Sequence, residues 1–150
     1  MLFDRIRALF SKKDVNRAKT TREKGFEGED AACCYLEDCG YTVIERNYCS
    51  SCGEIDIIAR DDRHIIFVEV KTREDGENIE KYGRPALAVT KEKQRRIIYT
   101  AKSYRAENIK GLLPRFDVIE IYQNTANDGV KYRINHIERA FDLNTAGLKR

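Results

Sequence analysis

The hydrophobic positions of this chain follow two periods, one typical of helices and one typical of strands. Apolar side chains recur at helical spacing over residues 26–39 and again over residues 90–107, and Gly40 follows the first of these segments. Runs rich in β-branched residues predict five strands, over residues 41–48, 54–60, 64–71, 115–122 and 130–137. The order helix, three strands, helix, two strands predicts an α/β layered domain built on a mixed sheet.

The first 24 residues differ from the rest of the chain in charge. They carry eight basic and three acidic side chains, and Met1–Phe10 has the apolar spacing of a short amphipathic helix. We therefore divide the chain into a basic N-terminal arm, residues 1–24, and a folded domain, residues 25–150. The arm suits a polyanion, with a solubilising tail as the alternative. The short helix is expected to pack on its own domain or fray, and a membrane-surface or partner contact is its alternative.

Composition narrows the class of protein. Charged residues make up 35% of the chain and apolar residues 41%, with 9 glycines and 2 prolines, which excludes a disordered, collagen-like or low-complexity protein. No apolar run reaches the roughly 18 residues of a membrane-spanning helix, and the N-terminus lacks the apolar core of a signal peptide. We therefore expect a soluble, cytoplasmic protein.

The cysteines raise the question of zinc. Cys49 and Cys52 have the spacing of a zinc knuckle, but a structural zinc site needs a second pair of ligands. The two histidines, His64 and His136, stand far away in sequence. We therefore expect reduced thiols and no zinc site.

Candidate catalytic residues lie on the second and third predicted strands. If these strands form a hairpin with an even-numbered loop, facing residues have numbers that sum to 125, so Asp56 lies opposite Glu69 and Glu54 opposite Lys71. All four side chains then share one face, because side chains alternate along a strand. The other face pairs aliphatic residues: Ile55 with Val70, Ile57 with Val68 and Ala59 with Ile66. An odd-numbered loop would instead separate Asp56 from Glu69.

Two facing carboxylates favour a bound cation. Asp56 and Glu69 would repel each other unless a positive charge lay between them, and Mg²⁺ prefers carboxylate oxygens and often completes its coordination with phosphate. Lys71 would lie at the rim of this site, where its ammonium group can orient water or neutralise a developing negative charge. Surface ion pairs, each worth roughly 0–1 kcal/mol, are the alternative interpretation.

Basic side chains near these residues are candidates for contact with a nucleic-acid backbone. The second helical segment is expected to bury Ile97, Ile98, Ala101 and Tyr104. Its exposed surface then carries Lys93 and Arg96, and Arg73 follows directly after the third predicted strand. Asp117 lies within an apolar strand, where a structural hydrogen-bonding role and a catalytic role both remain open.

Several motifs together resemble a known family. Asp56 followed by Glu69-Val70-Lys71 resembles the D…(D/E)xK signature of restriction-endonuclease-like nucleases. The resemblance is closer to the YraN-like family of bacterial proteins, which is related to archaeal Holliday junction resolvases. It covers about residues 25–122 and rests on five segments: Gly25–Ala32, Arg46–Tyr48, Gly53–Ala59, Phe67–Arg73 and Arg115–Val118. Cys49-Ser-Ser-Cys52 departs from the family pattern, in which a basic residue is more common.

The resemblance implies a restriction-endonuclease-like fold, a mixed sheet flanked by helices, in which Glu29 joins Asp56, Glu69 and Lys71. It also implies that Asp56, Glu69 and Glu29 hold Mg²⁺ or Mn²⁺. We therefore predict a metal-dependent endonuclease that hydrolyses DNA, with branched or junction DNA as a candidate substrate. A non-catalytic nucleic-acid-binding or assembly module of the same fold is the alternative. Related resolvases act as dimers, so a homodimer is considered, although the sequence shows no dimer surface.

Overall fold

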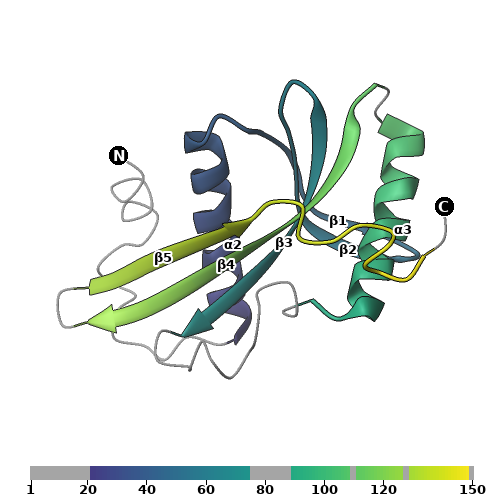
Figure 1. Ribbon diagram of the computed structural model, residues 1–150. Helices are drawn as coiled ribbons and strands as arrows, with labels where there is room; N and C mark the ends of the chain where they lie inside the picture. The colour runs from purple at the N-terminus through teal and green to yellow at the C-terminus, as the bar shows by residue number, and fades with distance from the viewer. Residues whose placement is uncertain (1–20, 75–88, 109–110, 127–128, 149–150) are drawn as a thin grey trace.

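The computed structural model describes residues 21–74, 89–108, 111–126 and 129–148 of the chain. Met1–Phe10 and most of the basic arm therefore lie outside the described residues. These residues form the following helices and strands (Figure 1): α2 (Thr21–Asp38), β1 (Thr42–Ser50), β2 (Gly53–Arg60), β3 (His64–Glu74), α3 (Lys91–Asn108), β4 (Leu113–Ala126) and β5 (Gly129–Ile137). The predicted order of helices and strands is confirmed.

The strands form one mixed sheet in the order β1-β2-β3-β4-β5. Neighbouring strands run antiparallel except β3 and β4, which are parallel and lie on either side of α3 in the chain. A parallel pair needs a crossover connection, and a helix is the usual one. The predicted mixed sheet with flanking helices is therefore present.

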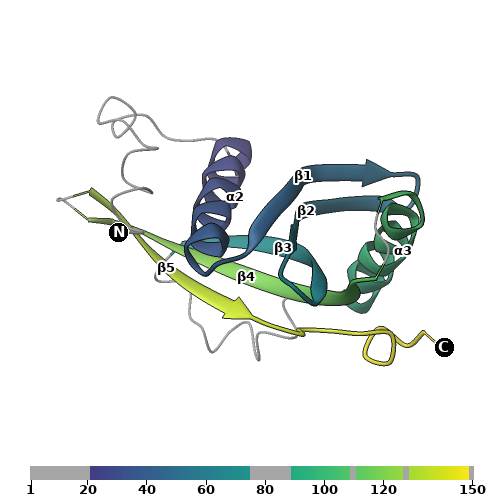
Figure 2. The same cartoon turned by 90° about the horizontal axis from the view of Figure 1, so that it is seen from above.

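The two helices pack on opposite faces of this sheet (Figures 1 and 2). Alternation along β4 shows the division: Phe116 and Val118 belong to the core beneath α3, whereas Ile119 and Ile121 belong to the core beneath α2. The α3 side of the core contains the four helix residues predicted to be buried, which are Ile97, Ile98, Ala101 and Tyr104.

Helix α2 begins earlier in the chain than predicted and ends where it was predicted to end. Thr21 begins the helix, so residues 21–24 form its first turn although the charge pattern places them in the arm. Apolar spacing marks only the packed part of a helix, which explains the missed turn. Gly40 ends the helix as predicted: it has a φ of 88°, and Tyr41 N–H donates to Leu36 O at 3.0 Å.

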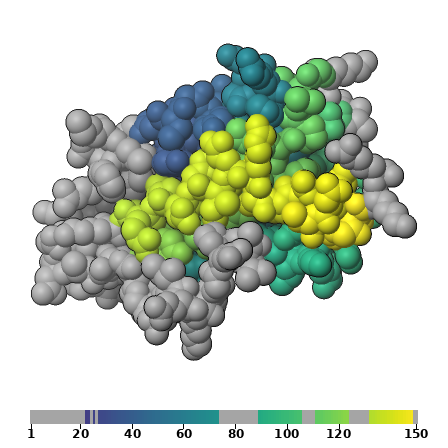
Figure 3. Space-filling model, in the orientation of Figure 1, coloured from purple at the N-terminus to yellow at the C-terminus, as the bar shows by residue number. Residues whose placement is uncertain are grey.

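The segment after β5 holds α3 against the sheet. Phe141 and Ala146 are buried in the core beneath α3, and Arg95 Nε donates to Ala146 O at 2.7 Å. Figure 3 shows β5 and this segment running across one side of the molecule. Within the described part of the chain, each helix is too short or too polar to cross a membrane.

Candidate metal and nucleic-acid site

The hairpin of β2 and β3 has the predicted register. Its pairs run from Arg60 opposite Ile65 to Ile57 opposite Val68, so the loop is even-numbered. The paired residues of β2 and β3 end at Ile57, and Asp56 is the next residue beyond this last pair. Instead, Asp56 Oδ2 accepts a hydrogen bond of 2.7 Å from the backbone N–H of Val70. The side chain of Asp56 thus takes the place of a backbone partner where the two strands separate.

The pairing of β1 with β2 keeps one register on both sides of Asp56, and its register shift lies farther along, between Val43 and Glu45. The backbone of β1 is nevertheless irregular opposite Asp56. Arg46 pairs with Ile57 and Tyr48 pairs with Ile55, while Asn47 between them has a φ of 51°. A left-handed conformation is uncommon for a residue other than glycine and breaks the regular strand. Asp56 therefore lies beyond the last β2–β3 pair and opposite the left-handed backbone of Asn47.

This irregularity corrects two of the predicted pairs. Ile55 belongs to the core beneath α3, whereas Val70 packs against the core beneath α2, so the two do not share an aliphatic face. Glu54 lies opposite Cys49 on β1, and Lys71 forms its ion pair with Glu69. Strict alternation fails here because the backbone of β2 turns about Asp56.

Glu69 is the most buried carboxylate of the predicted site, with 3% of its surface exposed. Lys71 Nζ lies 2.8 Å from its Oε1, and Lys93 Nζ reaches from α3 to within 3.4 Å of its Oε2. Two ammonium groups therefore compensate one buried carboxylate, as burial of a charge requires.

Glu29 reaches the site from α2 and is oriented by β1. Arg46 Nη2 lies 3.7 Å from Glu29 Oε2 and 2.7 Å from Asp30 Oδ1. Arg46 belongs to a segment that carries the family resemblance, but no role for it was predicted from the sequence. The structure places it as the residue that joins β1 to α2 beside the candidate site.

The three carboxylates interact electrostatically at Asp56. Burial, together with the negative charges of Glu69 and Glu29, raises the pKa of Asp56 to about 7, against the lowering effects of the hydrogen bond from Val70 and the charge of Lys93. The carboxylates of Glu29 and Glu69 therefore influence Asp56 electrostatically, although both also have cationic partners. The electrostatic interaction between Asp56 and Glu69 agrees with the proximity that the hairpin register predicts.

The donor set fits a hard divalent cation in part. Within the described residues, Glu29 Oε2 and Glu69 Oε2 are buried and accept no hydrogen bond, and oxygens of this kind are what Mg²⁺ or Mn²⁺ prefers. However, the described residues contain no group of three or more His, Cys, Asp or Glu side chains gathered closely enough to hold a metal. The predicted ligands Asp56, Glu69 and Glu29 therefore do not form a closely gathered set of three in this structure.

The three basic side chains predicted to contact a nucleic-acid backbone have different surroundings. Lys93 is part of the site through Glu69. Arg96 is exposed and pairs with Glu92 at 2.6 Å. Arg73 turns toward β4, where its Nε lies 3.5 Å from Glu120 Oε1. Lys93 therefore contacts a predicted catalytic carboxylate, that of Glu69.

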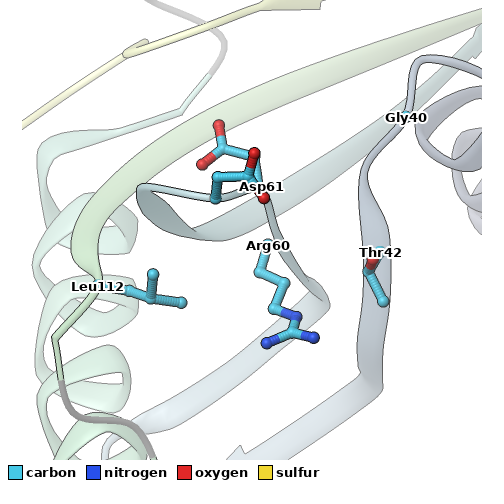
Figure 4. Close-up of a pocket in the computed structure, with 6 residues that line it drawn as sticks. Gly40, Thr42, Arg60, Asp61 and Leu112 are labelled. Carbon is cyan, nitrogen blue, oxygen red and sulfur yellow. The ribbon is translucent and has the colours of Figure 1, made fainter.

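Two cavities of about 330 Å³ each lie at opposite ends of β2. One adjoins the candidate site, because Lys93 helps to line it; its other lining residues are Cys49, Ser50, Gly53, Glu54 and Arg96. The other cavity contains no predicted site residue, and Figure 4 shows Arg60, Asp61 and Leu112 on its wall. The first cavity is thus the one positioned to take part of a ligand.

Asp117 accepts several hydrogen bonds in the interior of the protein. Its carboxylate is fully buried and accepts hydrogen bonds from Arg115 at 2.7 Å, from the backbone N–H of Arg139 at 3.0 Å and, through Nε2, from His136 at 2.9 Å. These interactions hold the pKa of Asp117 below its usual value despite its burial. Asp117 therefore joins β4 to the end of β5, and it lies apart from the Asp56 site.

Gly28 controls how closely α2 approaches β3, next to Glu29. A Cβ at this position would overlap Thr72 Oγ1 and lie 3.2 Å from Thr72 Cβ. Gly28→Ala is therefore expected to lower the free energy of unfolding by about 1–3 kcal/mol, as overpacking does. Urea denaturation measures this loss.

Gly25 provides a matched control for Gly28, since a Cβ there meets nothing within 4 Å. Gly25→Ala is expected to stabilise α2 by about 0.5–1 kcal/mol, the difference in helix propensity. Thr72→Ala should recover most of the loss in Gly28→Ala. Equal effects of the two glycine substitutions would contradict the close approach.

Comparison with known proteins identifies similar sequences. A family model described as "Uncharacterised protein family UPF0102" matches residues 28–121, which include Glu29, Asp56, Glu69 and Lys71. A UPF0102 protein of Geotalea uraniireducens is 44% identical over 120 residues, 79% of this chain and 89% of its own length. A UPF0102 protein of Clostridium perfringens is 44% identical over 124 residues, 82% of this chain and 97% of its own length.

Proposed function

The chain belongs to the uncharacterised protein family UPF0102, and from the site described above we propose that it is a divalent-metal-dependent endonuclease acting on DNA phosphodiester bonds. The observation that carries the proposal is the break in the sheet at Asp56. There, Asp56 accepts a hydrogen bond from the backbone of Val70, the residue after Glu69, and the ammonium group of Lys71 lies 2.8 Å from Glu69 Oε1. Among the described residues, Glu69 Oε2 is buried and accepts no hydrogen bond, with the ammonium group of Lys93 3.4 Å away.

Each residue has a distinct role in this proposal. Asp56 and Glu69 would hold Mg²⁺ or Mn²⁺, with Glu29 completing the surroundings of the ion or orienting water; the ion would activate water and polarise the phosphate. Lys71 is about one-third exposed, so its ammonium group can approach a phosphate while it pairs with Glu69. We assign it the stabilisation of negative charge that develops on the phosphate.

The restriction-endonuclease-like relationship is part of the same proposal. A mixed sheet with helices on both faces and the acid, acid, lysine set on β2 and β3 support it. The sequence motifs resemble a family related to Holliday junction resolvases, so four-way junction DNA is the first substrate to test. Lys93 and the exposed Arg96 would contact phosphates beside the site.

The lysine provides the sharpest test of catalysis. Lys71→Ala should lower the rate of DNA cleavage by about 10²–10³-fold, the range for loss of an electrostatic catalyst, while Mg²⁺ binding at Asp56 and Glu69 persists. Cleavage is measured on linear, flapped and four-way junction DNA, with metal added and with metal removed by a chelator. Lys102→Ala, at an exposed lysine of α3, is the control and should cleave at the wild-type rate.

Two results would reject the nuclease proposal. Cleavage that persists in purified Asp56→Asn protein would mean a contaminant or another site. DNA binding without any metal-dependent cleavage by the wild-type protein would instead favour a non-catalytic nucleic-acid-binding module.

A further inference from the structure

Cys49 and Cys52 lie at the tip of the β1–β2 hairpin and have no role in the proposed nuclease site. Ser50 pairs with Gly53, so Ser51 and Cys52 form a two-residue turn. Both cysteines are exposed free thiols. The turn lies at the edge of the molecule beside α3 (Figure 2), where a second macromolecule can reach it.

The hairpin tip is held in place by contacts with α3 and within the turn. Ser50 Oγ donates to Thr100 Oγ1 at 3.4 Å, and the backbone N–H of Cys52 donates to Ser50 Oγ at 3.1 Å. A Cβ on Gly53 would lie 3.5 Å from Arg96 Cβ, so the backbone passes close to the helix. The two thiols are therefore carried by an anchored turn, which lowers the entropy lost when they bind a ligand together.

Two cysteines separated by two residues are a chelating pair for a soft tetrahedral ion. Zinc ribbons and knuckles take two of their four ligands from such a pair. Over residues 21–74, 89–108, 111–126 and 129–148, no third His, Cys, Asp or Glu joins this pair in a metal-binding group. One chain thus supplies half of a structural zinc site.

We propose that Cys49 and Cys52 bind one Zn²⁺ ion together with the same pair from a second copy of this chain. Two identical half-sites related by a two-fold axis give the four ligands of a tetrahedral site and close the assembly as a dimer. This resolves the missing second pair of ligands, and it identifies a dimer contact that the sequence did not reveal. The inference does not rest on the proposed nuclease function, because it involves neither Asp56 nor Glu69.

The test uses the full chain in reduced form, titrated with Co²⁺ as a spectroscopic substitute and then with Zn²⁺. Expected are the thiolate-to-cobalt charge-transfer bands and intense visible bands of a tetrahedral sulfur site, with saturation at one ion per two chains. Light scattering should show a doubling of mass that a chelator reverses. Cys49→Ser and Cys52→Ser should each abolish both signals, and Cys39→Ser, at another exposed cysteine, should abolish neither.

Three results would overturn the inference. Saturation at one ion per chain without a change in mass would mean that each chain completes its own site. Co²⁺ spectra unaffected by Cys49→Ser would place the ion elsewhere. Failure of the reduced protein to bind Zn²⁺, with formation of a Cys49–Cys52 disulfide in air, would make the pair a redox element. A parallel Mg²⁺ titration of the Cys49→Ser/Cys52→Ser variant tests the nuclease site separately.

Discussion

Replacing Asp56 with asparagine is expected to stabilise the metal-free protein at pH 8 and to abolish its binding of Mg²⁺. The pKa of Asp56 is raised from 3.8 to about 7, so the folded state holds this proton more tightly than the unfolded chain does. The resulting stability is fully present below pH 3.8 and is lost as the pH rises through 7. At pH 8 the wild-type protein carries the repelling charge, and Asp56→Asn removes it.

The expected gain is about 2 kcal/mol in the free energy of unfolding at pH 8, and much less at pH 5. One pKa unit corresponds to about 1.4 kcal/mol, and part of this shift is shared with Glu69. Urea denaturation at the two pH values measures the difference. Saturating Mg²⁺, at about 100 times its Kd, should add about 2.7 kcal/mol to the wild-type protein and nothing to the variant.

Asp62 offers a matched control, because its carboxylate is exposed in the turn between β2 and β3. Asp62→Asn should leave both the pH dependence and the effect of Mg²⁺ as in the wild-type protein. A loss of stability in Asp56→Asn that is equal at pH 5 and pH 8 would contradict the prediction. It would mean that the carboxylate serves only the hydrogen bond to Val70.

The local geometry of β2 and β3 could be predicted because a hairpin has few degrees of freedom. Once the loop length is even, the register follows, and the pairs from Ile57–Val68 to Arg60–Ile65 confirm it. Alternation then identifies which side chains share a face. The register as far as Ile57–Val68 therefore followed from two adjacent segments of sequence, whereas Asp56 lies just beyond the last pair.

Contacts that depend on distant segments could not be predicted in the same way. The turn of β2 about Asp56 accompanies the left-handed backbone of Asn47 on β1, which no hydrophobic period indicates. Glu29 is placed by the close packing of Gly28 on Thr72, a contact between a helix and a strand far apart in the chain. The sequence alone left Glu29 as an ordinary glutamate of the first helix, and only the family resemblance singled it out.

Lys71 shows why charge pairing is hard to predict even within a known register. Facing positions suggested Glu54 as its partner, but the strands separate before reaching that pair, so the flexible lysine side chain reaches back along its own strand to Glu69. The ion-pair partner of a long side chain depends on how deeply the opposite charge is buried as well as on the strand register. Glu69 is buried and therefore the carboxylate with the greater need for a cation.

Loss of the Asp117 carboxylate is expected to have the largest effect on stability. Arg115 is 5% exposed and depends on Asp117 for its hydrogen bonds of 3.0 Å from Nε and 2.7 Å from Nη2. Asp117→Ala leaves this guanidinium group buried without its main counter-charge, which typically costs about 3–5 kcal/mol. Because the pKa of Asp117 is lowered in the folded state, the stability that it provides is present above its unfolded pKa and is lost as the pH falls through the folded value.

A double-mutant cycle distinguishes an unpaired buried charge from a simple loss of packing. Arg115→Leu/Asp117→Leu removes both charges, and buried pairs replaced by apolar residues are often close to neutral in stability. The double variant should therefore lose less free energy of unfolding than the sum of Arg115→Leu and Asp117→Leu, by more than about 1 kcal/mol. Asp62→Ala, at an exposed carboxylate, should change stability by less than about 0.5 kcal/mol. Additive losses in the cycle would show that Arg115 finds its compensation elsewhere, in Tyr41 or Glu138.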